Sequence, residues 1–405
     1  MPIVFEGATI SGGISIEPAP PIIGTQKAIF GYGSAGGLGT QSVTNLVSNT
    51  GVVATDTTGV GTARANLAAA GYGGDKAIFG YGSGPTAITN LVSNTGVVAN
   101  NTTGVGTTRS ALAAAGYGTD KAIFGYGNDG SSNVSITNLV SNTGVVATDT
   151  AGVGTARQTL AAADYGFDKA IFGYGTTGSV TAVTNLVSNT GVVATDTTGV
   201  GTARRYLAAA GYGTDKAIFG YGQSPASSIT NLVSNTGVVG NDVTGVGTAR
   251  NDLAAANYGT DKAIFGFGFE SGQYVSMTNL VSNTGVVGND VTGVGTARRR
   301  LAATGYGTDK AIFGFGFEPV FSPLNITNLV SNTGVVATDT AGVGTARAEL
   351  AAAGYGSSGQ AIFGYGTAVG PTSISSLVSN TGVVSSDVTG VGTARSRLAA
   401  AGYGS

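Results

Sequence analysis

Short runs of small or apolar residues alternate with polar turns along almost the whole chain. The order of runs and turns repeats eight times, and Leu-Val-Ser-Asn-Thr-Gly-Val-Val recurs unchanged in every unit. The Ala-Ile-Phe-Gly runs begin at eight positions from Ala28 to Ala361, so the mean period is about 47.6 residues. Runs this short, separated by Gly- and Asn-containing turns, are typical of strands, and the pattern predicts an all-β repeat protein.

Each unit contains four candidate strands, which the second unit illustrates. The first, residues 67–72, ends in Gly-Tyr-Gly too soon for its alanines to form a helix, and its small side chains suit a crowded position near an axis. The second, residues 76–81, is apolar on both faces, as a strand packed between two layers must be. The third and fourth, residues 88–92 and 97–100, flank Ser-Asn-Thr-Gly, whose Asn and Gly tolerate the positive φ of a tight hairpin.

Two architectures fit such units, a β-propeller and a right-handed β-helix. The coils of a β-helix usually have shorter periods, and its chain does not return to its start. The repeats begin with a second strand (27–33) that no inner strand precedes, and they end with an inner strand (398–403) that no second strand follows. These two strands together complete one blade, as in a ring without exposed sheet edges. We therefore predict a single eight-bladed β-propeller of four-stranded blades over residues 26–405, closed by pairing of the C-terminal inner strand with the N-terminal second strand.

The unit resembles a kelch repeat. Ala-Ile-Phe-Gly-Tyr-Gly stands where kelch units have an aliphatic strand with a double glycine, and Asn-Leu-Val-Ser-Asn-Thr-Gly-Val-Val stands where they have a Tyr-Asp-Pro-x-Thr-Asn-x-Trp hairpin. Gly-Thr-Ala-Arg-x-x-Leu-Ala-Ala-Ala corresponds to the kelch Pro-x-x-Arg-x-x-x-x-x-Ala run, whereas the kelch Gly-Gly pair and Trp are absent. The resemblance covers residues 25–405 and implies a propeller that binds ligands through residues after the repeated arginine. The units are also similar to repeats in bacteriophage tail and fibre proteins.

The composition removes several classes of function. The 405 residues carry 19 Lys and Arg against 21 Asp and Glu, and every lysine occupies the same repeat position, so we expect no surface for nucleic acid. His, Cys and Trp are absent, which excludes disulfides, thiol chemistry and most zinc or copper sites. No segment is long and apolar enough to span a bilayer, and the first residues lack the regions of a secretory signal. We expect assembly in a cytoplasm, with neither membrane insertion nor a cofactor.

Charged residues that recur from unit to unit are candidate sites, and we interpret them as structural. The repeated arginines could form an anion-binding ring, but pairing with a carboxylate or carbonyl within or between blades is favoured. Asp75 and Lys76, with their equivalents, flank a turn and are interpreted as a solvated rim. The aspartates of Ala-Thr-Asp-Thr offer one carboxylate per turn, short of the about six to eight oxygens that Ca²⁺ takes, so we expect no metal site. These arginines and aspartates are Arg64, Arg109, Arg157, Arg204, Arg250, Arg298, Arg347 and Arg395, and Asp56, Asp149, Asp196 and Asp339.

Catalysis is disfavoured by the same composition. No His can act as a general base, and no Cys can act as a nucleophile or as a copper partner of the galactose-oxidase type. Sialidase propellers use Trp-containing Asp boxes beside an arginine trio, and this chain has no Trp. A pair of carboxylates converging in the central channel would be required for glycoside chemistry, and every carboxylate outside the loops is taken to be a repeated position. We therefore expect a protein that is not an enzyme.

Variation between the units is concentrated in two places. One is the segment after Gly-Tyr-Gly or Gly-Phe-Gly, and the other is the pair of residues after the repeated arginine. In antiparallel, up-and-down blades these two places share one face of the ring, and the near-constant turns share the other. Confinement of variation to one face indicates recognition there, by loops on a rigid scaffold. The alternative is that the longer loops merely tolerate change.

The strongest contact site is predicted on three adjacent blades of the variable face. Aromatic side chains and arginines gather there, and these are the usual hot-spot residues of binding surfaces. The predicted site residues are Arg205, Tyr206, Phe269, Glu270, Tyr274, Arg299, Arg300, Phe317, Glu318 and Phe321.

These expectations combine into a non-enzymatic structural and attachment protein of a virion, a phage tail or fibre component that presents its variable face to a glycan or protein of the host surface. The alternative is a cellular lectin or a protein-binding adaptor. Residues 1–25 are predicted to be an anchoring arm that pairs with another virion protein or with another copy of the chain. In this arm, residues 10–16 alternate like a half-buried strand, and residues 17–21 form a stiff proline-rich spacer.

Overall fold

The computed structural model describes residues 27–403 of the chain with short gaps. The gaps are residues 36–38, 58–60, 84–85, 103–105, 151, 198–200, 224–225, 245–246, 293–294, 320–321, 341–343, 389 and 391. The predicted anchoring arm, residues 1–25, lies outside the described residues, and so does the predicted site residue Phe321.

The described residues form an all-β protein of eight antiparallel sheets, each with three strands. The innermost strands, rich in alanine, are β3 (Ala68–Tyr72), β6 (Ala113–Tyr117), β9 (Ala161–Tyr165), β12 (Ala208–Tyr212), β15 (Ala254–Tyr258), β18 (Ala302–Tyr306), β21 (Ala351–Tyr355) and β24 (Ala399–Tyr403). The middle strands are β1 (Lys27–Gly31), β4 (Lys76–Gly80), β7 (Lys121–Gly125), β10 (Lys169–Gly173), β13 (Lys216–Gly220), β16 (Lys262–Glu270), β19 (Lys310–Gly314) and β22 (Gln360–Gly364). The third strands are β2 (Thr44–Val47), β5 (Thr89–Val92), β8 (Thr137–Val140), β11 (Thr184–Val187), β14 (Thr230–Val233), β17 (Gln273–Val281), β20 (Thr327–Val330) and β23 (Ser375–Val378).

We number the sheets along the ring. Sheet 1 contains β24, β1 and β2, sheet 2 contains β3 to β5, and the numbering continues to sheet 8, which contains β21 to β23. The part of the chain that the structure describes has no helix that could cross a membrane.

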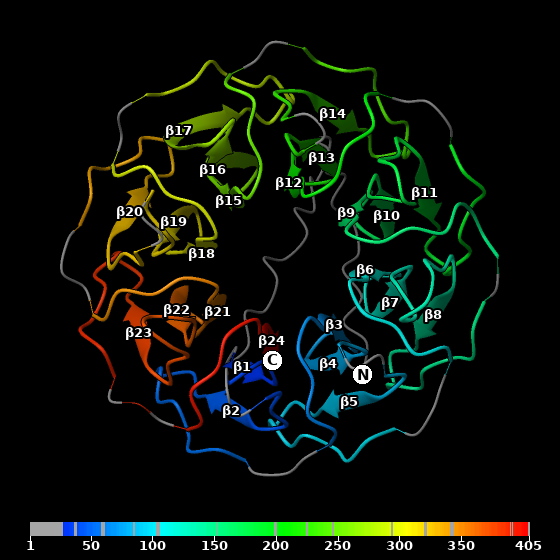
Figure 1. Cartoon of the computed structure of the whole chain (residues 1–405), viewed down its shortest axis with the longest axis horizontal. Helices are drawn as coiled ribbons and strands as arrows, with labels where there is room; N and C mark the ends of the chain where they lie inside the picture. The colour runs from blue at the N-terminus through cyan, green and yellow to red at the C-terminus, as the bar shows by residue number, and fades with distance from the viewer. Residues whose placement is uncertain are drawn as a thin grey trace, which may run out of the picture.

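The eight sheets stand in a ring, with the alanine-rich strands nearest the centre (Figure 1). β24 pairs with β1 from Lys27↔Tyr403 to Gly31↔Ala399. This register repeats the pairing of β12 with β13, where Tyr212 faces Lys216. The last strand therefore shares a sheet with the first two strands, the pairing that the unmatched strands at the two ends of the repeat predict.

The fourth predicted strand of each unit is not a continuous strand. In sheet 5 the outer segment meets β14 only through the isolated bridges Val233↔Val239 and Thr230↔Val243. Between these bridges, the side-chain amide of Asn231 donates to the carbonyl of Gly240 at 3.1 Å. Because a side chain takes the place of ladder hydrogen bonds, the outer segment lies against the sheet without extending it by a regular strand.

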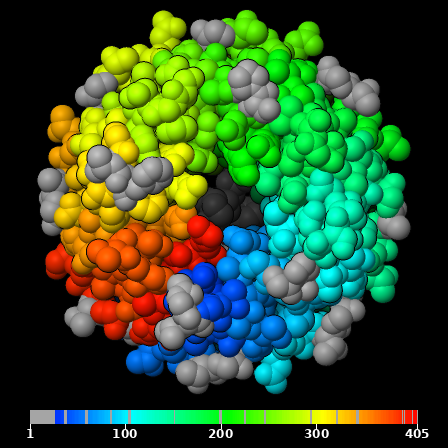
Figure 2. Space-filling model, in the orientation of Figure 1, coloured from blue at the N-terminus to red at the C-terminus, as the bar shows by residue number. Residues whose placement is uncertain are grey.

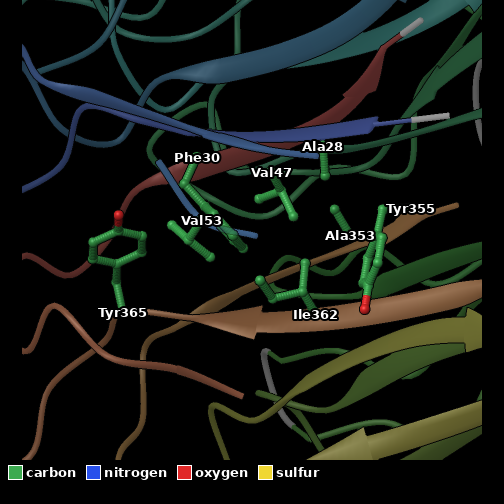
Figure 3. Close-up of a cluster of buried hydrophobic side chains, with 8 residues drawn as sticks. All are labelled: Ala28, Phe30, Val47, Val53, Ala353, Tyr355, Ile362 and Tyr365. Carbon is green, nitrogen blue, oxygen red and sulfur yellow. The ribbon is translucent and has the colours of Figure 1, made fainter. Parts of the chain in front are cut away.

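The hydrophobic core is divided into eight clusters, each of which lies between two neighbouring sheets. The cluster between sheets 8 and 1 joins Phe30 and Val47 to Ile362 and Tyr365 (Figure 3). Its composition matches that of the other seven, so the junction between the first and last sheets is packed like every other junction.

One contact recurs at all eight junctions. The ring of Phe265 in sheet 6 lies over Gly220 in sheet 5, so close that a Cβ at Gly220 would be 2.7 Å from the ring. The same ring meets Tyr221 edge to face, with centroids 5.3 Å apart. Phe265 is fully buried, and only glycine leaves room for it. The equivalent pairs are Gly31–Phe79, Gly80–Phe124, Gly125–Phe172, Gly173–Phe219, Gly266–Phe313, Gly314–Phe363 and Gly364–Phe30.

We expect Gly220→Ala to lower the free energy of unfolding by about 1–3 kcal/mol, because the new methyl group would overpack the Phe265 ring. Gly211→Ala is the matched control, since a Cβ there meets its nearest neighbour at 3.6 Å, an ordinary contact. Urea unfolding of the two variants measures both effects. Equal stability of the two proteins would contradict the role of the close approach.

Candidate functional site

The repeated arginines lie inside the ring scaffold. Arg204 is fully buried, and its guanidinium stacks on the ring of Tyr174 in the preceding sheet at 4.0 Å. It donates to Oδ1 of Asn231 at 2.6 Å and to the carbonyl of Thr202 at 2.9 Å. The other seven arginines are equally buried and stack in the same way on Tyr or Phe. The interpretation of the repeated arginines as structural is confirmed, because their guanidinium groups are buried between sheets and do not form an exposed ring that could bind an anion.

Burial shifts the pKa values of the arginines and tyrosines at these junctions but does not change their charge at neutral pH. Burial lowers the pKa of Arg298 to about 9, against the opposing effect of nearby Asp339, so the guanidinium stays charged at neutral pH. Burial likewise raises the pKa of the Tyr174 phenol to about 12, so the ring under Arg204 stays neutral.

The aspartates considered as calcium ligands accept hydrogen bonds from neighbouring segments of the chain instead. Oδ2 of Asp149 accepts from the backbone NH and the hydroxyl of Thr107 at 2.9 and 2.7 Å. Oδ1 accepts from Asn138 at 3.0 Å. Over the described ranges, no group of three or more Asp, Glu, His or Cys gathers in a way that could hold a metal ion.

The near-constant turns form one end of the sheets, which we call the turn face. Lys216 pairs with Asp215 at 2.8 Å, and the amide of Asn235 donates to the other carboxylate oxygen at 2.8 Å. The Lys216 and Asn235 hydrogen bonds hold the pKa of Asp215 below its usual range. The NH of Gly213 donates to the carbonyl of Asp261 in the next sheet at 2.6 Å. The predicted rim is thus a set of bonded, half-exposed ion pairs, and these bonds explain why its sequence is constant.

The two variable places meet at the other end, which we call the variable face. Arg205 and Gln223 exchange backbone hydrogen bonds at 3.0 and 2.7 Å, and Arg299 and Phe317 do so at 3.1 and 2.9 Å. The predicted placement of both variable segments on one face is confirmed for these sheets. Backbone atoms make the bonds, so the side chains are free to differ.

Three of the predicted site residues form one cluster across sheets 6 and 7. β16 and β17 are longer than their equivalents and join through a tight turn at Ser271 and Gly272, both with positive φ. In this hairpin the rings of Phe269 and Tyr274 meet edge to face at 5.4 Å. The Arg299 guanidinium lies 4.4 Å from the first ring and 5.1 Å from the second.

Tyr274, predicted as a contact residue, is only 9% exposed because it packs against Phe269 and Arg299. Glu270 and Phe317, in contrast, are half-buried.

The remaining predicted residues are distributed around this cluster. Tyr206, in sheet 5, is 45% exposed, and the guanidinium of Arg205 lies 5.0 Å from its ring. Phe317 is joined to Arg299 by its backbone, and the NH of Glu318 donates to the carbonyl of Ser322 at 3.0 Å. Arg300 belongs to a further set of charges, which meets the cluster where Nη1 of Arg299 lies 3.4 Å from Asp252.

That set is a charged arc, formed by the second residue of the variable pair in four consecutive sheets. Asp252, Arg300, Glu349 and Arg397 alternate in sign. Nη1 of Arg300 lies 2.7 Å from Glu349, and Nε of Arg397 lies 3.1 Å from it. Successive members are also joined by backbone hydrogen bonds of 3.2 to 3.3 Å. Sequence reasoning missed the arc, although the alternating sign at one repeat position was its signal.

The centre of the ring is hollow (Figure 2). A cavity of about 920 Å³ opens at the turn face and is lined by the alanines of the inner strands and by turn residues. Two strand residues here depart from the glycine of the other sheets, Asp164 in β9 and Asn257 in β15. The expectation that every carboxylate outside the loops is a repeated position is therefore wrong for Asp164.

Asp164 is exposed to the cavity, and its Oδ1 accepts from the NH of Gly116 at 3.1 Å. The surrounding walls displace much of the water around it, and this desolvation raises the pKa of the carboxyl to about 6. Its signal in the sequence was the replacement of the repeated glycine of the inner strand by aspartate in one unit.

No protein-family model and no curated protein matches this sequence. Among solved structures, the chain is similar to one described as "Structure of YjhT", with a TM-score of 0.45 and 11% identity, over 66% of this chain and 95% of that one.

We expect the Asp164 carboxyl to titrate near pH 6 and to make folding pH-dependent. Between its ordinary pKa of 3.8 and about 6, the folded state keeps a proton that the unfolded state has lost, so stability from this group falls as pH rises through that window. The rim aspartates Asp120, Asp168 and Asp215, whose pKa values are lowered, titrate below it. Urea midpoints measured between about pH 4 and pH 7 should lose this slope in Asp164→Gly and keep it in Asn257→Gly. The same slope in both variants would contradict the assignment.

Proposed function

We propose that this chain is a non-enzymatic recognition protein, a closed eight-bladed β-propeller that presents its variable face to a partner. The proposal is supported by a difference between the two faces in which atoms make the hydrogen bonds. On the turn face, side chains such as Asn235 and Asp215 make hydrogen bonds, whereas the variable segments at Arg205–Gln223 and at Phe317 are joined through the backbone. A fixed backbone with interchangeable side chains is the property that a display surface requires.

Closure of the propeller, with the outer segment as the fourth strand of each blade, is part of this proposal. It is supported by the pairing of β24 with β1 and by the packing of Phe30 on Gly364. A closed ring holds the loops of different blades at fixed distances, which a multi-blade recognition site needs.

Deletion of residues 396–405 should open the ring. It removes β24 and the Glu349–Arg397 pair and leaves β1 as an exposed edge. We expect aggregation, or a fall in the melting midpoint of about 10 °C or more. The control is a circular permutant in which Ser405 is joined to Lys27 through one aspartate, which recreates the Gly-x-Asp-Lys turn, with new termini in the 223–228 loop. Retained stability of the deletion would refute closure, as would a permutant that fails to fold.

We further propose that the protein serves in a virion, where the variable face contacts a glycan or protein of the host surface and the residues 1–25 join it to other virion proteins or to a second copy. The similarity of the repeats to those of phage tail and fibre proteins supports the setting. Tyr206, Arg300 and the Phe269–Tyr274 hairpin supply the aromatic and arginine chemistry that binding surfaces favour.

A loop exchange tests the recognition face. Replacing residues 269–276 with residues 223–228, together with Tyr206→Ala, removes the hairpin and the exposed ring and shortens β16 and β17 to the length of their equivalents in sheet 5. We expect cell-surface binding of the labelled protein to fall by about tenfold or more. Val238→Ser is the matched control, because Val238 is 67% exposed beside the turn face. Equal binding by the exchanged protein would overturn the recognition site.

The virion setting has a separate readout. Antibody labelling should place the full chain on purified particles, and a chain that lacks residues 1–24 should fold but stay off them. Particles without the protein would overturn the setting and leave an adaptor or lectin as the recognised function.

A further inference from the structure

The turn face is similar in most units, and sheet 4 departs from the consensus at two neighbouring positions that line the cavity. In sheet 4, Asp164 stands where the other inner strands have glycine or Asn257, and Phe167 stands where four other turns have threonine. Both residues line the central cavity. Phe167 is 73% exposed at a φ of 66°, so an apolar ring is held in solvent at the cavity wall. This pair is separate from the variable face and does not depend on the function proposed for it.

The charges of the cavity cancel in pairs except at Asp164. Lys121, Lys169 and Lys216 lie 2.7 to 2.8 Å from the aspartates that precede them, and Lys76 pairs with Asp75 in the same way. Among the described residues, Asp164 makes its hydrogen bond to the NH of Gly116 and has no cationic partner. Its oxygens retain acceptor capacity for a further donor.

Alanine methyl groups lie beside Asp164 in the cavity wall, and the bonded Asp–Lys pairs of the turns lie nearer the opening. The alanines Ala114, Ala162 and Ala209 from neighbouring inner strands line the cavity and offer methyl groups without hydrogen-bonding capacity. A ligand with a methylene chain and one positive group can contact these methyl groups and the Asp164 carboxylate at the same time. An aromatic ring at the wall adds a surface on which a cation or its methylene chain can rest.

We propose that the central cavity binds an alkylammonium group, with its charge at Asp164, its methylene chain along the alanines and its outer part against Phe167. A lysine side chain of an extended partner segment and a free polyamine both carry this chemistry. The desolvation that raises the pKa of the Asp164 carboxyl also strengthens the attraction between its ionised form and a cation in the cavity.

The test uses the full chain and two probes, spermidine and an acetylated, amidated Gly-Gly-Lys-Gly-Gly peptide. Calorimetry should detect binding of at least one probe to the parent. Asp164→Gly should weaken that binding by about tenfold or more, and Phe167→Thr by about threefold. Each substitution installs the residue that other sheets already carry at that position, so the fold is expected to survive, and the melting midpoint checks this.

Two controls separate the outcomes. Asn257→Gly, which changes the same cavity without touching a charge, should bind like the parent, and a peptide whose lysine is Nε-acetylated should not bind. Preference for the peptide would identify a partner's lysine as the ligand, and preference for spermidine a free amine. Equal binding by parent and Asp164→Gly would overturn the proposal, as would no binding of either probe to the parent. Neither result bears on the variable face, since the loop exchange alters no residue of the cavity.

Discussion

The structure depends on the close approach of a phenylalanine ring to a glycine across each junction. Each middle strand contains a Phe followed directly by a Gly. In β16, Phe265 fills the space over Gly220 of the preceding sheet, and Gly266 receives the ring of Phe313 from the next sheet. Each middle strand thus carries both halves of the joint. Because the same joint is repeated, the angle between neighbouring sheets is repeated too, and eight equal steps bring Phe30 onto Gly364. The junction between the first and last sheets is therefore packed in the same local way as the other seven.

The buried arginines make this joint specific. Desolvating eight guanidinium groups is costly unless each is bonded, and the contacts of Arg204 with Tyr174, Asn231 and Thr202 draw on two sheets. Its Nε has no hydrogen-bond partner among the described residues, as in the seven equivalents, so the aromatic face contributes part of what water would have supplied. If one sheet moved relative to its neighbour, the buried guanidinium of Arg204 would lose these partners.

The sequence predicted the strands, the turns and the pairing of β24 with β1, because each follows from local periodicity and from the unmatched strands at the two ends of the repeat. It predicted which segments share a face for the same reason. The exposure of Tyr274 could not be predicted so simply, since it depends on how far a hairpin extends. Phe-Glu-Ser-Gly-Gln-Tyr reads, in retrospect, as two strand residues on each side of a Ser-Gly turn, which folds Tyr274 back onto Phe269. The outer segment is less regular than its apolar pattern predicts, because the Asn231 side chain bonds the Gly240 carbonyl, an effect that a count of apolar residues does not contain.

In a scaffold of nearly identical units, departures from the consensus carry most of the information about function. A residue that departs from the repeat and also makes a structural bond, such as Glu349 between Arg300 and Arg397, can be explained by stability. Asp164 makes one hydrogen bond, to the NH of Gly116, and is left without a cationic partner among the described residues, while Phe167 is held in solvent. Glycine and threonine at those two positions already fold in other sheets. Asp164 and Phe167 lie at the turn face, while Tyr206 and the Phe269–Tyr274 hairpin lie at the variable face, and the Phe–Gly joints separate the two. Since that packed layer is the same in every sheet, it offers no second arrangement through which one end could influence the other. The two ends are therefore expected to act independently on one rigid body.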